Sequence, residues 1–127
     1  MSAVQPGIFV STTDFDRLTA LLDDLPPGES DRLRPLSEEL DRAELLDPCD
    51  MPHDVVAMHS TVRFSLDAAA GDLRLTLVYP GEVGDRMDRI SVFAPVGSAL
   101  LGLQAGTRIV WPRPGGGMQT ITVRDVS

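Results

Sequence analysis

The chain has 127 residues, with 19 acidic residues against 11 arginines and no lysine, and a formal net charge of −8. This length supports one modest hydrophobic core, and no run of residues approaches the ~20 apolar residues that cross a membrane. The first residues lack a basic stretch followed by an apolar run, and the single cysteine, Cys49, cannot form an internal disulfide. These features predict a soluble, unprocessed cytoplasmic protein that acts without a membrane.

Charge is divided unevenly along the chain. Residues 1–54 carry 13 acidic residues and 4 arginines, a net charge of −9, whereas residues 55–127 carry 6 and 7, a net charge of +1. An acidic surface repels the phosphates of nucleic acid. We therefore expect no direct recognition of nucleic acid, and a basic protein surface suits the first half better as a partner.

The first predicted element is an amphipathic helix. Four apolar residues recur at spacings of 3, 4 and 3 and so share one helical face: Phe15, Leu18, Leu22 and Leu25. Thr13 and Asp16 have the form of a capping box at the start of this helix.

A second helix is predicted from the stripe of Leu36, Leu40 and Ala43. Residues 26–28, Pro-Pro-Gly, exclude helix between the two stripes, and Pro35 fits only a first turn, so this helix should run from about residue 35 to residue 46. Residues 1–50 thus predict a short, coiled-coil-like antiparallel hairpin with arms of ~18 Å. Its tip carries four acidic residues: Asp23, Asp24, Glu29 and Asp31.

Beyond Pro48 the apolar period changes from helical to alternating, which places a domain boundary near residues 48–54. Five strands are predicted, with turns over residues 67–72 and 112–117: Val62–Leu66, Leu73–Tyr79, Arg89–Phe93, Thr107–Trp111 and Met118–Val123. Together with one short helix they predict an antiparallel α+β domain over residues 51–127, with Phe64 and Tyr79 in its core. We expect this domain to fold without the hairpin.

The most distinctive segment is residues 90–106, ISVFAPVGSALLGLQAG. It begins as a buried strand and continues as a helix for which Pro95 suits the start. The helical stretch Gly97–Leu101 is too short to be stable except by packing, and Gly102 and Gly106 should end it and turn the chain.

This segment resembles the C-terminal domain of the Gre-type transcription factors, whose pattern is a strand, Ser-Pro, small residues, Ala-Leu-Leu and Gly. Here residues 94–102 read Ala-Pro-Val-Gly-Ser-Ala-Leu-Leu-Gly. Residues 51–60, MPHDVVAMHS, and residues 77–80, LVYP, are similar to one branch of that family, the regulators of nucleoside diphosphate kinase (Rnk). The resemblance covers the chain from about Ile8 onward, and it implies the FKBP-like version of the sheet domain and RNA polymerase as partner.

In Gre factors the loop before the Ser-Pro step contacts the polymerase rim, and the matching positions here are Phe93, Ala94 and Pro95. The Gre pattern has an acidic residue and Ser at the first two, whereas this chain, like the Rnk branch, has apolar residues there. The resemblance implies a monomeric regulator that docks near the secondary channel, competes with Gre factors and does not catalyse RNA cleavage. Phe93 could anchor this interface, and the alternative is that Phe93 belongs to the core.

The acidic tip is the other candidate site. In the cleavage-stimulating Gre factors, two acidic residues at the tip of a long coiled coil help to hold a catalytic magnesium. Here the arms are far shorter and the tip acids do not form that compact pair, so we expect a solvated loop. No catalytic residue, metal or cofactor is predicted.

Rival functions are open at this stage. The branch name suggests direct regulation of nucleoside diphosphate kinase, although no feature of the sequence is aimed at that enzyme. An FKBP-like prolyl isomerase needs a pocket with several aromatic walls, and the sheet domain has four aromatic residues: Phe64, Tyr79, Phe93 and Trp111.

Other chemistry is weakly supported. Cys49, His53 and His59, with Asp50 and Asp54 nearby, lack the spacing of a common zinc site. Ser98 lacks the nucleophile-elbow motif and is better explained as a small residue that allows close packing. Residues 115–117, Gly-Gly-Gly, lack the Lys and Ser or Thr of a phosphate loop.

Overall fold

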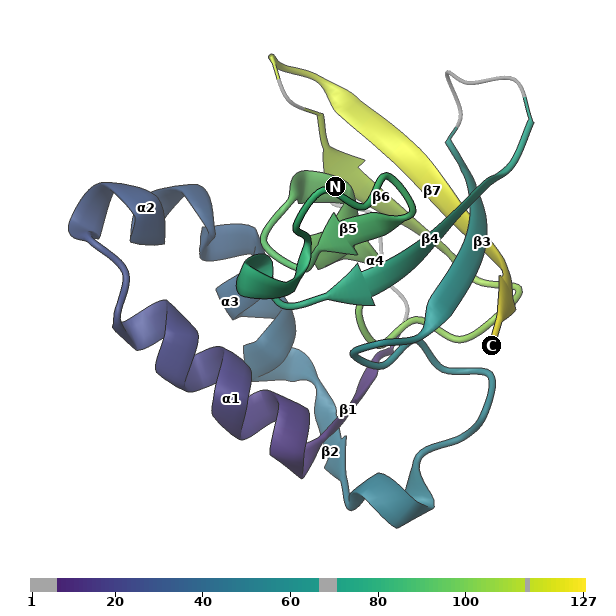
Figure 1. Ribbon diagram of the computed structural model, residues 1–127, viewed down its shortest axis with the longest axis horizontal. Coiled ribbons are helices and arrows are strands. Elements are labelled where there is room, and N and C mark those ends of the chain that lie inside the picture. Colours follow the sequence, from purple (N-terminus) through teal and green to yellow (C-terminus); the bar gives the residue numbers. More distant parts are fainter. Residues whose placement is uncertain (1–6, 67–70, 114) are drawn as a thin grey trace.

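A curled sheet carries most of the chain from residue 61 onward in the computed structural model, which describes residues 7–66, 71–113 and 115–127 (Figure 1). Its strands lie in the order β5-β4-β3-β7-β6. Their bounds are β3 Thr61–Leu66, β4 Leu73–Val78, β5 Arg89–Ser91, β6 Arg108–Pro112 and β7 Met118–Val126. All five lie where the alternation of apolar residues predicts strands.

Alternation places every second side chain on the concave, buried face. Val62 and Phe64 of β3 and Ile121 and Val123 of β7 are fully buried, and Tyr79, just after β4, is 3% exposed. The predicted core positions of Phe64 and Tyr79 are therefore confirmed.

The predicted antiparallel pairing is correct for three of the four strand pairs and wrong for one. β3 pairs antiparallel with β4 and with β7, and β6 pairs antiparallel with β7. β5 instead runs parallel to β4. The chain between them crosses back through the short 3₁₀ helix η2, Pro80–Glu82, and a loop, so β5 starts at the same end of the sheet as β4.

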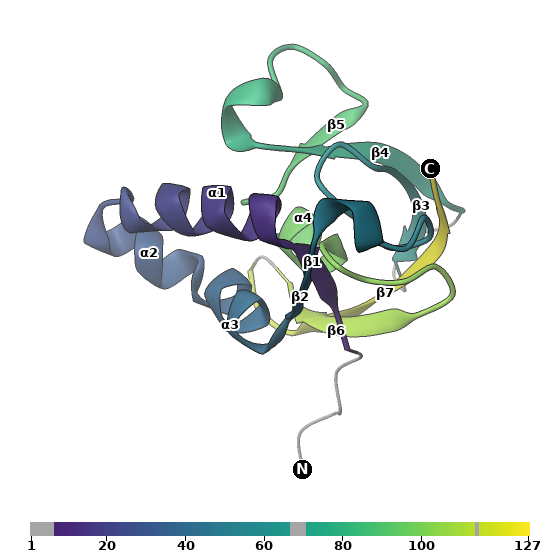
Figure 2. The same cartoon turned by 90° about the horizontal axis from the view of Figure 1, so that it is seen from below.

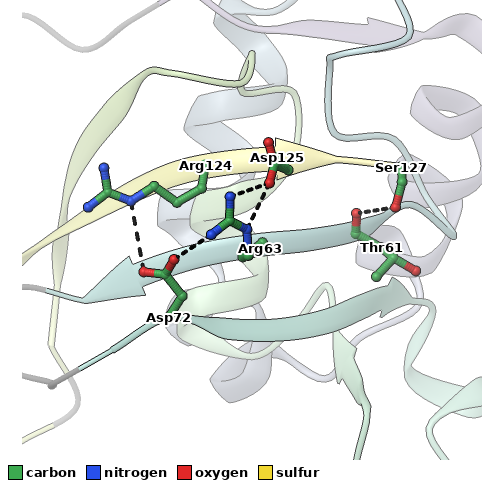
Figure 3. Close-up of polar contacts among 6 residues, drawn as sticks. All are labelled: Thr61, Arg63, Asp72, Arg124, Asp125 and Ser127. Atoms are coloured by element: carbon green, nitrogen blue, oxygen red, sulfur yellow. Dashed lines mark hydrogen bonds and ion pairs between the residues drawn. The ribbon is translucent and has the colours of Figure 1, made fainter.

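Ion pairs cross the solvent face of β3 and β7 (Figure 3). Arg63 Nη1 lies 2.9 Å from Asp72 Oδ2, and its Nε donates to Asp125 Oδ2 at 2.8 Å. The carboxylate of Asp125, with that of Asp72, raises the pKa of Arg63. These groups are exposed, so the pairs align the strands more than they stabilise the fold. Of the predicted turn over residues 67–72, residues 67–70 lie outside the described part.

Helix α4, Pro95–Leu100, packs inside the curl against β5, β6 and β7. At Gly97 a Cβ would lie 2.0 Å from the backbone oxygen of Ser91, so only glycine permits this approach. The Ser98 hydroxyl donates to the Val92 carbonyl at 2.7 Å. Gly102 (φ 82°) and Gly106 (φ 90°) turn the chain after the helix, as predicted.

Residues 9–46 form a helical segment that leaves the sheet domain along α1 and returns through α2 and α3 (Figure 2). The elements are β1 Phe9–Ser11, α1 Thr12–Asp23, α2 Pro27–Arg32, α3 Arg34–Arg42 and β2 Glu44–Leu46. A second 3₁₀ helix, η1, covers Pro48–Asp50. None of the helices in the described residues is long and apolar enough to cross a membrane.

Three local predictions for this segment are wrong. The cap of α1 is Ser11, whose side chain accepts from the Asp14 N–H, and not Thr13. Residues 26–28 do not exclude helix, because Pro27 occupies the first position of α2, where a missing N–H costs nothing. The predicted second helix ends at Arg42 and not near residue 46.

The early end of α3 follows from a long-range pairing. Ala43 is already extended, and Glu44, Leu45 and Leu46 pair in parallel with Phe9, Val10 and Ser11. The strand β1 thus supplies backbone partners that outweigh the helical preference of the Glu-Leu-Leu segment.

The helical segment, with Ile8 just before it, and the sheet domain contribute to one hydrophobic core. Side chains from both are packed together in it: Ile8, Val10, Leu18, Leu36 and Leu40 from the first part, and Phe64, Leu100, Leu101 and Leu103 from the second. The burial of Leu18, Leu36 and Leu40 confirms the predicted helical stripes at these positions. The two parts are also joined at Gly102, whose carbonyl accepts the Phe9 N–H at 3.2 Å.

Candidate functional site

A groove of about 640 Å³ opens between the helical segment, the start of α4 and the end of β6. Its walls come from three stretches of sequence: Arg32, Leu33, Pro35 and Leu36; Ser91, Phe93, Ala94, Pro95 and Ser98; and Trp111, Pro112 and Arg113. The groove therefore contains all three positions that the family resemblance assigns to polymerase contact.

The start of α4 positions these three residues. The Ala94 N–H donates to the Ser91 carbonyl at 3.0 Å, and the Phe93 N–H donates to the Ser91 hydroxyl at 3.0 Å. Ala94 is the N-cap of α4 and Pro95 its first residue, whose fixed φ suits that position. The tight turn directs the Phe93 side chain to the groove.

Phe93 is half-buried, so it has features of both a core residue and an interface residue, the two alternatives that the sequence leaves open. Part of its ring packs against the core, and part lines the groove beside Ala94 and the exposed Pro95. A half-buried aromatic residue at the edge of an apolar depression has the form of many interface anchors.

The lining of the groove is mainly apolar, with charge at its rim. Leu33, Leu36 and Trp111 are at most 4% exposed as whole residues. Arg32, which forms an ion pair with Glu29, and Arg113, whose Nη2 donates to the Met118 carbonyl at 3.4 Å, are the cationic residues of the lining. The Ser98 hydroxyl is already committed to Val92. This arrangement suits binding of a partner's apolar side chains and supplies no nucleophile with a base.

The four acidic residues of the predicted tip lie on two different elements. Asp23 ends α1 and Asp24 is its C-cap, whereas Glu29 and Asp31 belong to α2 and are not in a loop. Glu29 pairs with Arg32, and Asp31 pairs with Arg34 at 3.2 Å. In residues 7–66, 71–113 and 115–127, no three His, Cys, Asp or Glu side chains are grouped as metal ligands would be.

Two of the weaker candidates, His59 and Asp54, have other structural partners. His59 Nε2 lies 2.9 Å from Glu82 Oε1, and Asp54 accepts from the Gln104 amide at 2.9 Å. Cys49 is exposed. Of the four aromatic residues of the sheet domain, Phe64, Tyr79 and Trp111 are almost fully buried.

One polar cluster has no counterpart in the sequence-based predictions. The Tyr79 hydroxyl donates to Asp14 Oδ1 at 3.2 Å, and the guanidinium of Arg17 lies 3.9 Å from the centroid of the Tyr79 ring. Burial, and next the negative charge of Asp14, raise the pKa of Tyr79 far above its usual value, so this phenol remains a donor. The only sequence signal was Tyr79 followed by Pro80 in the Rnk-like segment, which does not point to a residue 65 positions earlier.

Comparison with known proteins gives matches along almost the whole chain. The family model "Transcription elongation factor, GreA/GreB, C-term" matches residues 51–127, and "Rnk N-terminus" matches residues 6–46. The chain is 42% identical over 118 residues to "Regulator of nucleoside diphosphate kinase" of Escherichia coli strain K12, covering 88% of this chain and 82% of that protein.

Two further relatives carry the name of elongation factors. "Transcription elongation factor GreA" of a Nitratiruptor species is 33% identical over 85 residues, which cover 67% of this chain and 52% of that protein. The solved structure of "Prokaryotic transcription elongation factor GreA/GreB from Nitrosomonas europaea" is 47% identical, with a TM-score of 0.73, and the match covers 97% of this chain and 99% of that one.

Proposed function

This chain belongs to the Gre family of transcription factors, in its Rnk branch, and from that membership we propose that it regulates transcription by binding RNA polymerase. In this proposal the protein docks as a monomer near the mouth of the secondary channel, through Phe93, Ala94 and Pro95, and competes there with Gre factors. The sheet domain would be the FKBP-like version of the fold.

The observation that carries the proposal is the position of these three residues in an apolar groove. Phe93 and Pro95 are accessible at the start of α4, and Leu33 and Trp111 lie beside them in the same lining. An aromatic residue and prolines around a depression give contact area at a low cost in side-chain entropy. The groove thus offers an anchor where the family resemblance places the contact.

We propose further that the protein does not stimulate transcript cleavage. Helix α1 has 12 residues, which span only ~18 Å. Two of the four acidic residues near the tip, Glu29 and Asp31, pair with arginines of the same segment. Because α1 is short and two of the tip carboxylates are paired with arginines, the tip is poorly suited to supply a magnesium ligand in the polymerase active centre.

A competition experiment tests this function. Core RNA polymerase is titrated with the labelled protein, with and without an excess of a cleavage-stimulating Gre factor, and stalled complexes are assayed for cleavage products. We expect saturable binding that the Gre factor displaces, and inhibition of Gre-stimulated cleavage. Cleavage by this protein alone, lost when Asp23 and Asp24 are changed to Asn, would overturn the second half of the proposal.

Direct action on nucleoside diphosphate kinase is the alternative that the name of the Escherichia coli relative supports. The same titration with purified kinase in place of polymerase separates the two, because only one of the enzymes should bind at low concentration. A prolyl isomerase is a third candidate, but the burial of Phe64 and Tyr79 in the core leaves few aromatic walls for its pocket. A tetrapeptide isomerisation assay tests it.

A further inference from the structure

Tyr79 joins the helical segment to the sheet domain through polar contacts. Its hydroxyl donates to Asp14 Oδ1 at 3.2 Å, and the other oxygen of that carboxylate accepts the Met58 N–H at 3.3 Å. Arg17, one turn further along α1, places its guanidinium 3.9 Å from the centroid of the Tyr79 ring. Two residues of α1 are thus held by one buried tyrosine and one backbone amide of the sheet domain.

The surroundings hold Tyr79 and Met58 in position. His59 packs edge-on against the Tyr79 ring, with centroids 5.8 Å apart, and its Nε2 lies 2.9 Å from Glu82 Oε1. The same Glu82 oxygen accepts the Tyr79 N–H at 3.1 Å. His59 has a φ of 71°, an uncommon value for a residue with a side chain, and its N–H donates to the Leu77 carbonyl at 2.6 Å. The turn that presents the Met58 N–H is therefore fixed to the end of β4.

Asp14 is in the first turn of α1, where a carboxylate interacts favourably with the helix dipole. Its two oxygens both accept hydrogen bonds from the sheet domain. Apolar packing around Leu18 also holds α1 in place, but that attraction is non-directional. Hydrogen bonds to two fixed donors, by contrast, define the orientation of the helix about its own axis and its angle to the sheet.

A small change at this point would be amplified at the tip. About ten residues of helix separate Asp14 from Asp24, a lever of ~15 Å, so a rotation of about 10° at Asp14 moves the far end by about 3 Å. The groove, lined by the sheet domain and by residues from the stretch 32–36 and by no residue of α1, would move much less than the tip.

We propose that Asp14 and Tyr79 form a latch that fixes the direction of α1 relative to the groove. The consequence for transcription rests on the proposed function: with the sheet domain docked on polymerase, the latch would determine where the acidic end of α1 lies. Asp14 and Tyr79 are then positioning residues, which act through the orientation of the helix and not by contact with the partner.

The latch itself is tested in the free, full-length protein by spin-label distance measurements. Labels are placed at Asp24→Cys and Arg108→Cys in a Cys49→Ser background, since all three sites are exposed and none belongs to the latch. Tyr79→Phe removes only the hydroxyl and keeps the ring for Arg17. The matched control is Thr76→Val, which removes a hydroxyl that bonds Thr61 at 2.9 Å within the sheet.

We expect one narrow distance distribution in the parent and in Thr76→Val, and a distribution broadened or shifted by a few ångströms in Tyr79→Phe. Asp14→Ala, which removes both acceptors, should give a larger change in the same direction. An unchanged distribution in both Tyr79→Phe and Asp14→Ala would overturn the latch. If Asp14→Ala unfolds, the Tyr79→Phe result alone decides.

Polymerase assays then test the consequence. We expect Tyr79→Phe to bind core polymerase within about twofold of the parent, because no residue of the groove lining is changed, and to inhibit Gre-stimulated cleavage less than that affinity predicts, because a displaced α1 would block the channel mouth less well. A widened distance distribution with an unchanged effect would confirm the latch and overturn its role in transcription. If the parent itself does not bind polymerase, the proposed function fails while the distance measurements still decide on the latch.

Discussion

The sheet domain and the helical segment contribute to the same core but differ in what determines their local structure. In the sheet domain, Val62 and Phe64 alternate with partly exposed residues and pair with neighbours on both sides. In the helical segment, α1 and α3 each bury only part of one face, and the strands at their base exist because β1 pairs with β2. Where strands pair with neighbours on both sides, the local structure agrees with the local sequence pattern. Where elements pair mainly at their ends, the local structure depends on residues far away in the sequence.

Charge separates the two regions as sharply as pairing does. The net charge of −9 in residues 1–54 against +1 in residues 55–127 leaves the acidic residues concentrated on the helices. The groove lies where the two regions meet, and Arg32 and Arg113 in its lining come one from each. Because both regions line the groove, its shape depends on their remaining packed together. Five experiments test this packing and the residues that maintain or use the groove.

Deleting residues 1–50 should have the largest effect. The deletion removes five side chains that are at most 4% exposed, all in the common core: Ile8, Val10, Leu18, Leu36 and Leu40. We predict that residues 51–127 still unfold cooperatively in urea, but with a loss of stability greater than the about 2–5 kcal/mol typical of one core truncation. A gradual, non-cooperative transition would show instead that the two regions form one folding unit.

Leu101→Ala tests the core at the junction of the regions. Leu101 is 2% exposed, beside the Gly102 contact with Ile8, and its truncation should cost about 2–5 kcal/mol. Leu73→Ala is the matched control, because Leu73 is 42% exposed, and its loss should be within ~0.5 kcal/mol. Equal effects in chemical denaturation would contradict the burial that separates the two leucines.

Gly97→Ala tests the close approach of α4 to the sheet. The added Cβ would meet a backbone oxygen at 2.0 Å, and backbone cannot rotate away as a side chain can, so we expect a loss of about 1–3 kcal/mol or more. At Gly81 an added Cβ meets nothing within 4 Å, so Gly81→Ala is the control. Thermal unfolding of the two variants should therefore differ clearly; similar melting temperatures would show that α4 can shift.

Phe93→Ala tests whether Phe93 contributes more to partner binding in the groove or to packing of the hydrophobic core. As an anchor, Phe93 should contribute about 2 kcal/mol or more to polymerase affinity, roughly a 30-fold change in Kd. Leu73→Ala, an exposed apolar residue outside the groove lining, should leave Kd unchanged. A lowered melting temperature with unchanged Kd would assign Phe93 to the core alone.

The sequence predicts most of the sheet because alternation is a local signal. β3, β4, β6 and β7 begin within one residue of the predicted starts, while the direction of β5 depends on the path of residues 79–88, which no local pattern encodes. The end of α3 likewise depends on β1, some 35 residues earlier. In the groove, the family pattern points to Phe93, but Leu33 and Leu36 join it only because α3 packs on α4.

Glu82→Gln tests the hydrogen bonds that hold His59 and Tyr79 where the two regions meet, and it should have the smallest effect of the five changes. The hydrogen bond from His59, and next that from the Tyr79 N–H, hold the pKa of Glu82 below its ordinary value of 4.5. A carboxyl with a lowered pKa in the folded state stabilises that state above pH 4.5, and the contribution is lost as the pH falls through the folded pKa. Because this side chain is exposed to solvent, the effect on stability is small.

We predict that Glu82→Gln has a slightly lower melting temperature than the parent at about pH 7 and that this difference shrinks between about pH 5 and pH 3. Other carboxylates, such as Asp88 beside Arg86, titrate equally in both proteins and cancel in the comparison. A difference that stays constant over this range would show that the ionised Glu82 does not hold His59 and Tyr79 in place.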